Sequence, residues 1–131
     1  MVHYVGIIDG SDDVWGVRIP DIPGAQGGGS TPEEAITSAV AALRDVVSYK
    51  RDGGFTIPPA SNLADILASG EVGAGEATVM IPLLLDSGRT VRANVTFDAG
   101  LLEAIDEAAR RSGVTRSAFL ASAARAKIAA I

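Results

Sequence analysis

Apolar and polar residues alternate along the segment Thr90–Thr96, and this alternation is the most informative pattern in the chain. A period of two is typical of a strand with one buried face and one open face. The small or apolar set comprises Val91, Ala93, Val95 and then Phe97, and the polar set comprises Thr90, Arg92, Asn94 and Thr96. The pattern therefore predicts a strand over these residues.

Two amphipathic helices are predicted directly after this strand. Asp98 is suited to start the first helix, Gly113 to end it, and Thr115 to start the second. Since one strand and two helices are too small to bury a core, we expect two copies to pair their strands. An antiparallel ribbon of that kind fits the major groove of DNA. The predicted dimer core comprises Val91, Ala93, Val95, Phe97, Leu102, Ile105, Phe119 and Leu120.

The open face of the predicted strand carries side chains of the types that bond base edges. Arg bonds guanine, Asn bonds adenine and Thr bonds either, so we expect base contacts from Arg92, Asn94 and Thr96. The start of the second helix favours a phosphate, and there we expect backbone contacts from Thr115, Arg116 and Ser117. The alternation by itself is equally typical of an ordinary edge or dimer strand with a solvated face.

Residues 1–85 show a different order of elements, which is typical of an α+β domain. A hairpin with a turn at Asp9–Asp13 is followed by a short strand, a long helix, a short helix and a last strand. Thr31 and Glu34 form a predicted capping box at the start of the long helix. The predicted strands are Val2–Ile8, Val14–Ile19, Ala25–Gly28 and Glu76–Leu85, and the predicted helices are Pro32–Tyr49 and Leu63–Ala68.

Charge separates the chain into the same two parts. We expect domains at residues 1–85 and 89–131, joined by a hinge at residues 86–88. Residues 1–85 hold 11 acidic and 4 basic residues, a net charge of −7, whereas residues 86–131 hold 5 acidic and 7 basic residues, a net charge of +2. The second part therefore suits DNA, and the acidic first part suits a basic partner.

Composition narrows the possible chemistry. The chain has no cysteine, which excludes disulfides and thiolate catalysis and fits the reducing cytoplasm, and His3 is its one histidine. No apolar run approaches the roughly 18–20 residues of a membrane helix, and the start of the chain is unlike a secretory signal. We therefore expect a cytoplasmic protein that is not an enzyme, binds no membrane and needs no cofactor or metal.

Two sets of motifs resemble known families. Arg92-Ala-Asn-Val-Thr-Phe-Asp98, Gly113 and Thr115-Arg-Ser-Ala-Phe-Leu120 resemble the ribbon-helix-helix family. In that family the outward strand residues of a dimer read the major groove, and the start of the second helix grips the DNA backbone. The stretches Tyr4–Ile8, Pro20-Asp-Ile-Pro-Gly24 and Ser30-Thr-Pro-Glu-Glu-Ala35 resemble the HicB antitoxin family, whose N-terminal domain is a partial RNase H-like fold.

Together these resemblances imply a partial RNase H-like β-β-β-α-β domain followed by a ribbon-helix-helix (β-α-α) dimerisation unit. They imply a type II antitoxin that neutralises a HicA-like, mRNA-cleaving toxin and represses its own operon by binding operator double-stranded DNA as a dimer or tetramer. One alternative is a stand-alone ribbon-helix-helix repressor with a ligand-sensing N-terminal domain. Another is a degenerate RNase H-like nuclease that holds metal through Asp9, Asp12 and Asp13, although such residues more often form a solvated turn.

Overall fold

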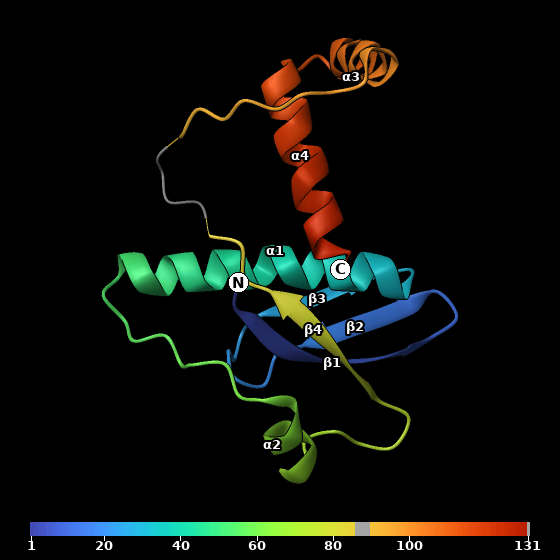
Figure 1. Cartoon of the computed structure of the whole chain (residues 1–131). Coiled ribbons are helices and arrows are strands. Elements are labelled where there is room, and N and C mark those ends of the chain that lie inside the picture. Colours follow the sequence, from blue (N-terminus) through green and yellow to red (C-terminus); the bar gives the residue numbers. More distant parts are fainter. Residues whose placement is uncertain (86–89, 131) are drawn as a thin grey trace. The chain divides into compact units, whose positions relative to one another are not determined.

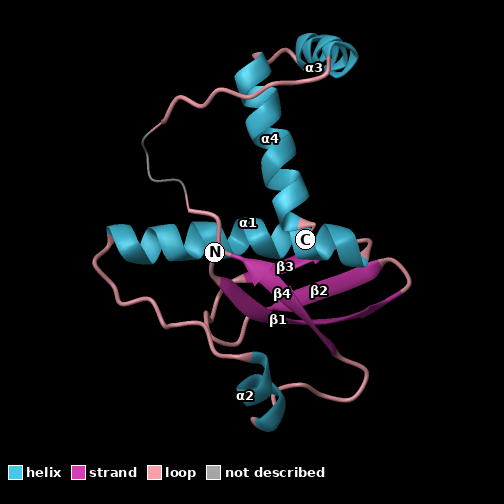
Figure 2. Cartoon of the chain, viewed as in Figure 1, coloured by secondary structure: helices cyan, strands magenta, loops and turns pink. Residues whose placement is uncertain are grey.

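The computed structural model describes residues 1–85 and 90–130 (Figure 1). The chain divides into two compact units, Met1–Leu85 and Asp86–Ile131, referred to below as unit 1 and unit 2. Unit 1 combines a sheet with two helices, and the described part of unit 2 contains two helices (Figure 2). The predicted hinge at residues 86–88 lies outside the described residues. The chain is thus an α+β protein, as its sequence predicts.

The sheet of unit 1 has four antiparallel strands in the order β3-β2-β1-β4. They are β1 (His3–Ser11), β2 (Val14–Arg18), β3 (Gln26–Gly29) and β4 (Ala77–Pro82). All four strands were expected from the sequence, but the last is shorter than the predicted Glu76–Leu85. Pro82 ends an edge strand, where its missing N–H is tolerated.

The β1–β2 hairpin corrects one sequence prediction. Strand β1 continues through the predicted turn, so that Asp9 pairs with Gly16 and Ser11 pairs with Val14. The turn that remains is formed by Asp12 and Asp13, and Asp12 adopts a left-handed φ of 54°, which Asp tolerates better than most residues. Because only Asp12 and Asp13 are needed for this tight turn, the hydrogen-bonded pairing of β1 with β2 continues up to it.

Helix α1 (Pro32–Asp52) covers one face of the sheet. The Thr31 hydroxyl accepts a hydrogen bond from the Glu34 amide, at 3.1 Å. The Glu34 carboxylate bonds the amide and hydroxyl of Ser30, at 2.9 and 2.7 Å, rather than the amide of Thr31. These bonds lower the pKa of Glu34, the Ser30 hydroxyl contributing most. The helix ends at Asp52, three residues later than the predicted Tyr49, and is capped by Gly53 after a last turn that carries Lys50 and Arg51.

Polar bonds tie the chain between α1 and β4 to β1 and to the loop between β2 and β3. Helix α2 (Leu63–Ala68) begins at Asn62, whose side chain accepts from the Asp65 amide. The Asp21 carboxylate accepts bonds from the amide and hydroxyl of Ser61, and the Tyr4 hydroxyl donates to the Pro58 carbonyl at 2.6 Å.

The core of unit 1 includes Val5, Ile7, Ile22, Leu43, Val47 and Ile81, each of them fully buried.

Candidate nucleic-acid interface

Unit 2 contains two helices, and each begins at an N-capping side chain. Helix α3 (Ala99–Arg111) begins at Asp98, whose carboxylate accepts from the amides of Gly100 and Leu101 at 3.0 and 3.2 Å. Gly113 follows α3 with a φ of +70°, a conformation that favours glycine. Helix α4 (Arg116–Ala129) begins at Thr115, whose hydroxyl accepts from the Ala118 amide at 3.1 Å. The predicted starts of both helices and the predicted end of α3 are therefore confirmed.

An ion pair joins the two helices at the start of α4. The Arg116 guanidinium donates from Nε and Nη2 to the two carboxylate oxygens of Asp106, at 2.7 and 2.8 Å. This bidentate bond lowers the pKa of Asp106 and raises the pKa of Arg116. Arg116 was predicted from the sequence to contact DNA phosphate, but its partner Asp106 was not predicted, because ten residues and a turn separate the two.

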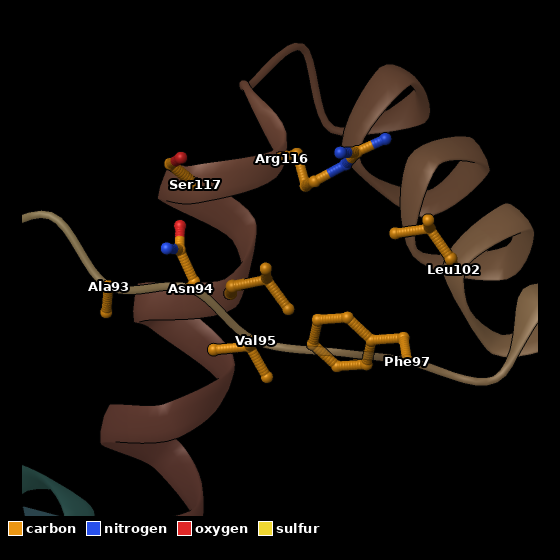
Figure 3. A pocket seen from close by; sticks show the side chains of 8 residues that line it. Ala93, Asn94, Val95, Phe97, Leu102, Arg116 and Ser117 are labelled. Carbon is orange, nitrogen blue, oxygen red and sulfur yellow. The ribbon is translucent and has the colours of Figure 1, made fainter.

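The segment before α3 lies against the helix pair and encloses a hollow of about 310 Å³. Figure 3 shows the Asn94 amide pointing toward the start of α4, where Ser117 lies, and the Phe97 ring pointing between the helices. The lining comes from the segment, from α3 and from the first turns of α4, and includes Ala93, Asn94, Val95, Phe97, Leu102, Arg116, Ser117 and Leu120. The hollow combines an apolar floor with polar groups at the start of a helix.

The predicted DNA contacts are brought together only in part. All six are exposed, and three of them, Asn94, Arg116 and Ser117, line the same hollow, whereas Arg92, Thr96 and Thr115 do not. Within the described part of the chain, the amides of Arg116 and Ser117 have no hydrogen-bond partner, as expected at the first positions of a helix. These amides and the Ser117 hydroxyl are the groups at the start of α4 for which the sequence predicts a phosphate contact.

The predicted dimer core is incompletely covered in the single chain. Val91 is 75% exposed and Val95 is 68% exposed, whereas Ile105 is buried. Ala93 is exposed, and the remaining residues, Phe97, Leu102, Phe119 and Leu120, are half-buried. The segment 90–97 pairs with no strand of the described residues. Its predicted partner is the same segment of a second copy, so the ribbon stays a prediction.

Unit 1 carries a second polar surface, on the sheet around Arg18. The Arg18 guanidinium donates to both Glu76 oxygens, at 2.5 and 2.9 Å, and to the Glu71 carbonyl at 2.9 Å. These Arg18 bonds, with one from the Gly73 amide, lower the pKa of Glu76 to about 2. A neighbouring hollow of about 230 Å³ is lined by Asp9, Gly16, Val17, Arg18, Gln26 and Gly27. This surface was not predicted from the sequence, because the residues that line the hollow come from three strands.

Two further observations concern the alternatives raised by the sequence. Within residues 1–85 and 90–130, no three His, Cys, Asp or Glu side chains are grouped so that they could hold a metal ion, and this includes Asp9, Asp12 and Asp13. None of the helices in the same ranges is both long enough and apolar enough to span a bilayer.

This chain is similar to a known protein family and to several solved structures. Residues 4–124 match the family of HicB-like antitoxins of bacterial toxin-antitoxin systems. The chain is similar to the crystal structure of the antitoxin HicB of Burkholderia pseudomallei, with 29% identity and a TM-score of 0.59, over 95% of this chain and 97% of that one. A comparison with curated proteins finds no match.

Two other solved structures are also similar. The antitoxin HicB3 is 26% identical with a TM-score of 0.54, over 97% of this chain and 98% of that one. A chain of the HicA3 and HicB3 toxin-antitoxin complex is 17% identical with a TM-score of 0.54, over 65% of this chain and 99% of that one. At this identity the second similarity concerns the fold alone.

Proposed function

This chain belongs to the family of HicB-like antitoxins of bacterial toxin-antitoxin systems, and we propose that it neutralises a HicA-like, mRNA-cleaving toxin through unit 1 and represses its own operon through unit 2. The observation that carries the proposal is the extent of the family match, which spans nearly all of unit 1 and most of unit 2. A similar protein, HicB3, is found in a complex with HicA3, which supports a toxin as the partner.

The charge of unit 1 supports the toxin-binding role. A toxin that cleaves mRNA needs a basic surface to hold the RNA backbone, and residues 1–85 carry a net charge of −7. We propose that unit 1, as a partial RNase H-like domain, covers that surface and competes with RNA for it.

The hollow beside Asp9 is the part of unit 1 that we propose contacts the toxin. The Arg18 guanidinium bonds Glu76, and the charge of Asp9 also contributes to the raised pKa of Arg18, although no hydrogen bond or ion pair joins Asp9 to another described residue. Gly16 leaves the adjoining sheet surface flat, although a Cβ there would lie 3.7 Å or more from its nearest neighbours. Packing therefore does not require glycine at this position, and a basic side chain of the partner has room to reach Asp9.

The repressor role is proposed for unit 2 as a ribbon-helix-helix dimer. The exposed Val91 and Val95 supply an apolar face for a second copy, and Arg92, Asn94 and Thr96 supply the opposite polar face. The start of α4 supplies amides for a phosphate. We propose that the paired segments read the operator and that each α4 start contacts its backbone.

Toxin neutralisation is tested with a fragment of residues 1–85, which holds its own core, and a HicA-like toxin encoded in the same operon. We expect the fragment to form a complex of defined mass and to stop mRNA cleavage without unit 2. Asp9→Asn in the full chain should weaken the complex, whereas Asp13→Asn, in the turn, should not. A fragment that is folded by circular dichroism but leaves the toxin free and active would contradict the proposal.

A further inference from the structure

The Arg116 guanidinium is already occupied by an anion within its own chain. Its Nε and Nη2 donate to the two oxygens of Asp106 at 2.7 and 2.8 Å, so the carboxylate fills the fork that a DNA phosphate would fill. Both partners are only partly screened by the protein, with side chains 53% and 42% exposed for Arg116 and Asp106. The pair therefore lies where a nucleic-acid backbone has access to it.

The surroundings of this pair are those of an anion site. Arg116 is the first residue of α4, and the amides of Arg116 and Ser117 have no partner in the part of the chain that the structure describes. A phosphate bound at these amides would lie next to the residue that carries the guanidinium, because Arg116 is itself the first residue of α4. The Asp106 carboxylate and a DNA phosphate would then be alternative partners of one guanidinium.

We propose that Asp106 is an intramolecular competitor of DNA phosphate at Arg116, and that it lowers the affinity of unit 2 for DNA of any sequence. The inference rests on the proposed DNA binding of unit 2. Phosphate contacts supply affinity without sequence information, whereas base contacts supply discrimination. A chain that holds one phosphate-binding arginine in an internal pair therefore depends more on base contacts, and Asp106 acts as a specificity-determining residue.

Two other arginines of unit 2 form ion pairs of a different kind, which lie within one helix. Arg110 and Arg111 both bond Glu107, within α3 and at spacings of three and four residues. Such pairs stabilise the helix that contains them. The Asp106–Arg116 pair instead connects α3 to the first residue of α4, so its acceptor faces the proposed DNA-binding end of α4.

The test compares variants of the full chain on a duplex of random sequence over a series of salt concentrations. Asp106→Asn frees Arg116, Glu103→Gln removes the same charge from an exposed position one turn away on α3, and Asp106→Asn with Arg116→Gln removes both partners. We expect tighter binding for Asp106→Asn than for Glu103→Gln. Its log–log salt dependence should steepen by about 0.9 for each new phosphate contact. The double variant should lose this gain.

Several results would overturn the inference. Equal gains for Asp106→Asn and Glu103→Gln would attribute the effect to net charge, and a gain that survives in the double variant would exclude Arg116. Asp106→Glu keeps a carboxylate and should bind about as weakly as the unmodified chain, so a gain confined to Asp106→Asn is due to the lost charge at this position. If the unmodified chain binds the operator, and Asp106→Asn binds the random duplex no more tightly than the unmodified chain does, this inference alone is rejected. Absence of DNA binding by every variant, on operator and random duplex alike, would reject the proposed repressor role together with it.

Discussion

Single polar residues hold the irregular parts of unit 1 in place. Arg18, on β2, bonds Glu76 and the Glu71 carbonyl, and so fixes the chain that enters β4. Glu76 also accepts from the Gly73 amide at 2.8 Å, which closes the turn before the strand. The carboxylate therefore has to be charged for the loop between α2 and β4 to keep these bonds.

The Glu76 carboxylate predicts an acid-sensitive unit 1. Its pKa is lowered from an ordinary 4.5 to about 2 by the Arg18 bonds. The stabilisation is therefore fully present above pH 4.5 and is lost as the pH falls from 4.5 to 2. We expect Glu76→Gln to be less stable than the unmodified chain at pH 6 and the difference to vanish near pH 2. Thermal unfolding followed by the fluorescence of Trp15, the one tryptophan, measures this. An equal loss in Asp13→Asn would contradict the assignment to Glu76.

The elements show which features the sequence alone could predict. The starts of α1, α2, α3 and α4 were predicted correctly, because an N-cap depends on a few neighbouring residues such as Thr31 or Thr115. The bonds of Glu34 to Ser30 and of Arg116 to Asp106 were not predicted, because they depend on how side chains meet in the folded chain. The hollow at Asp9 needed the strand register, which a single sequence leaves open.

The contact between β3 and α1 predicts a large difference between adjacent glycines. A Cβ on Gly27 would lie 2.2 Å from the Ala39 amide nitrogen, and these backbone atoms belong to a regular helix. A Cβ on Gly28 would meet its nearest atom, the Trp15 carbonyl oxygen, at 3.4 Å. We expect Gly27→Ala to lower the free energy of unfolding by at least the ~1–3 kcal/mol typical of overpacking. Gly28→Ala should change it by about 0.5 kcal/mol or less. Denaturant unfolding of both variants decides, and similar losses would show that α1 does not pack this closely on β3.

At the scale of the molecule, the two units differ in the kind of side chain that they leave exposed to solvent. Unit 1 buries an apolar core of its own and leaves a polar, acidic surface. Unit 2 leaves Val91 and Val95 exposed beside polar residues that alternate with them. Exposed apolar residues in a row are typical of an interface. The proposed second copy would cover this face, because paired copies of one strand place the same side chains against each other across a twofold axis.

We therefore predict that substitutions at neighbouring residues of the segment 90–97 affect different properties, either dimerisation or DNA discrimination. Val95→Glu places charge in the proposed apolar face, so we expect it to convert the dimer to a monomer in sedimentation and to abolish operator binding. Arg92→Ala and Asn94→Ala remove polar side chains only, so the dimer should remain. Each should cost about 1–3 kcal/mol in binding to the operator and little on unrelated DNA, where no base contact is lost. If Val95→Glu stays dimeric, the segment is not the interface, and if the two alanine variants keep full discrimination, the segment is not the reader.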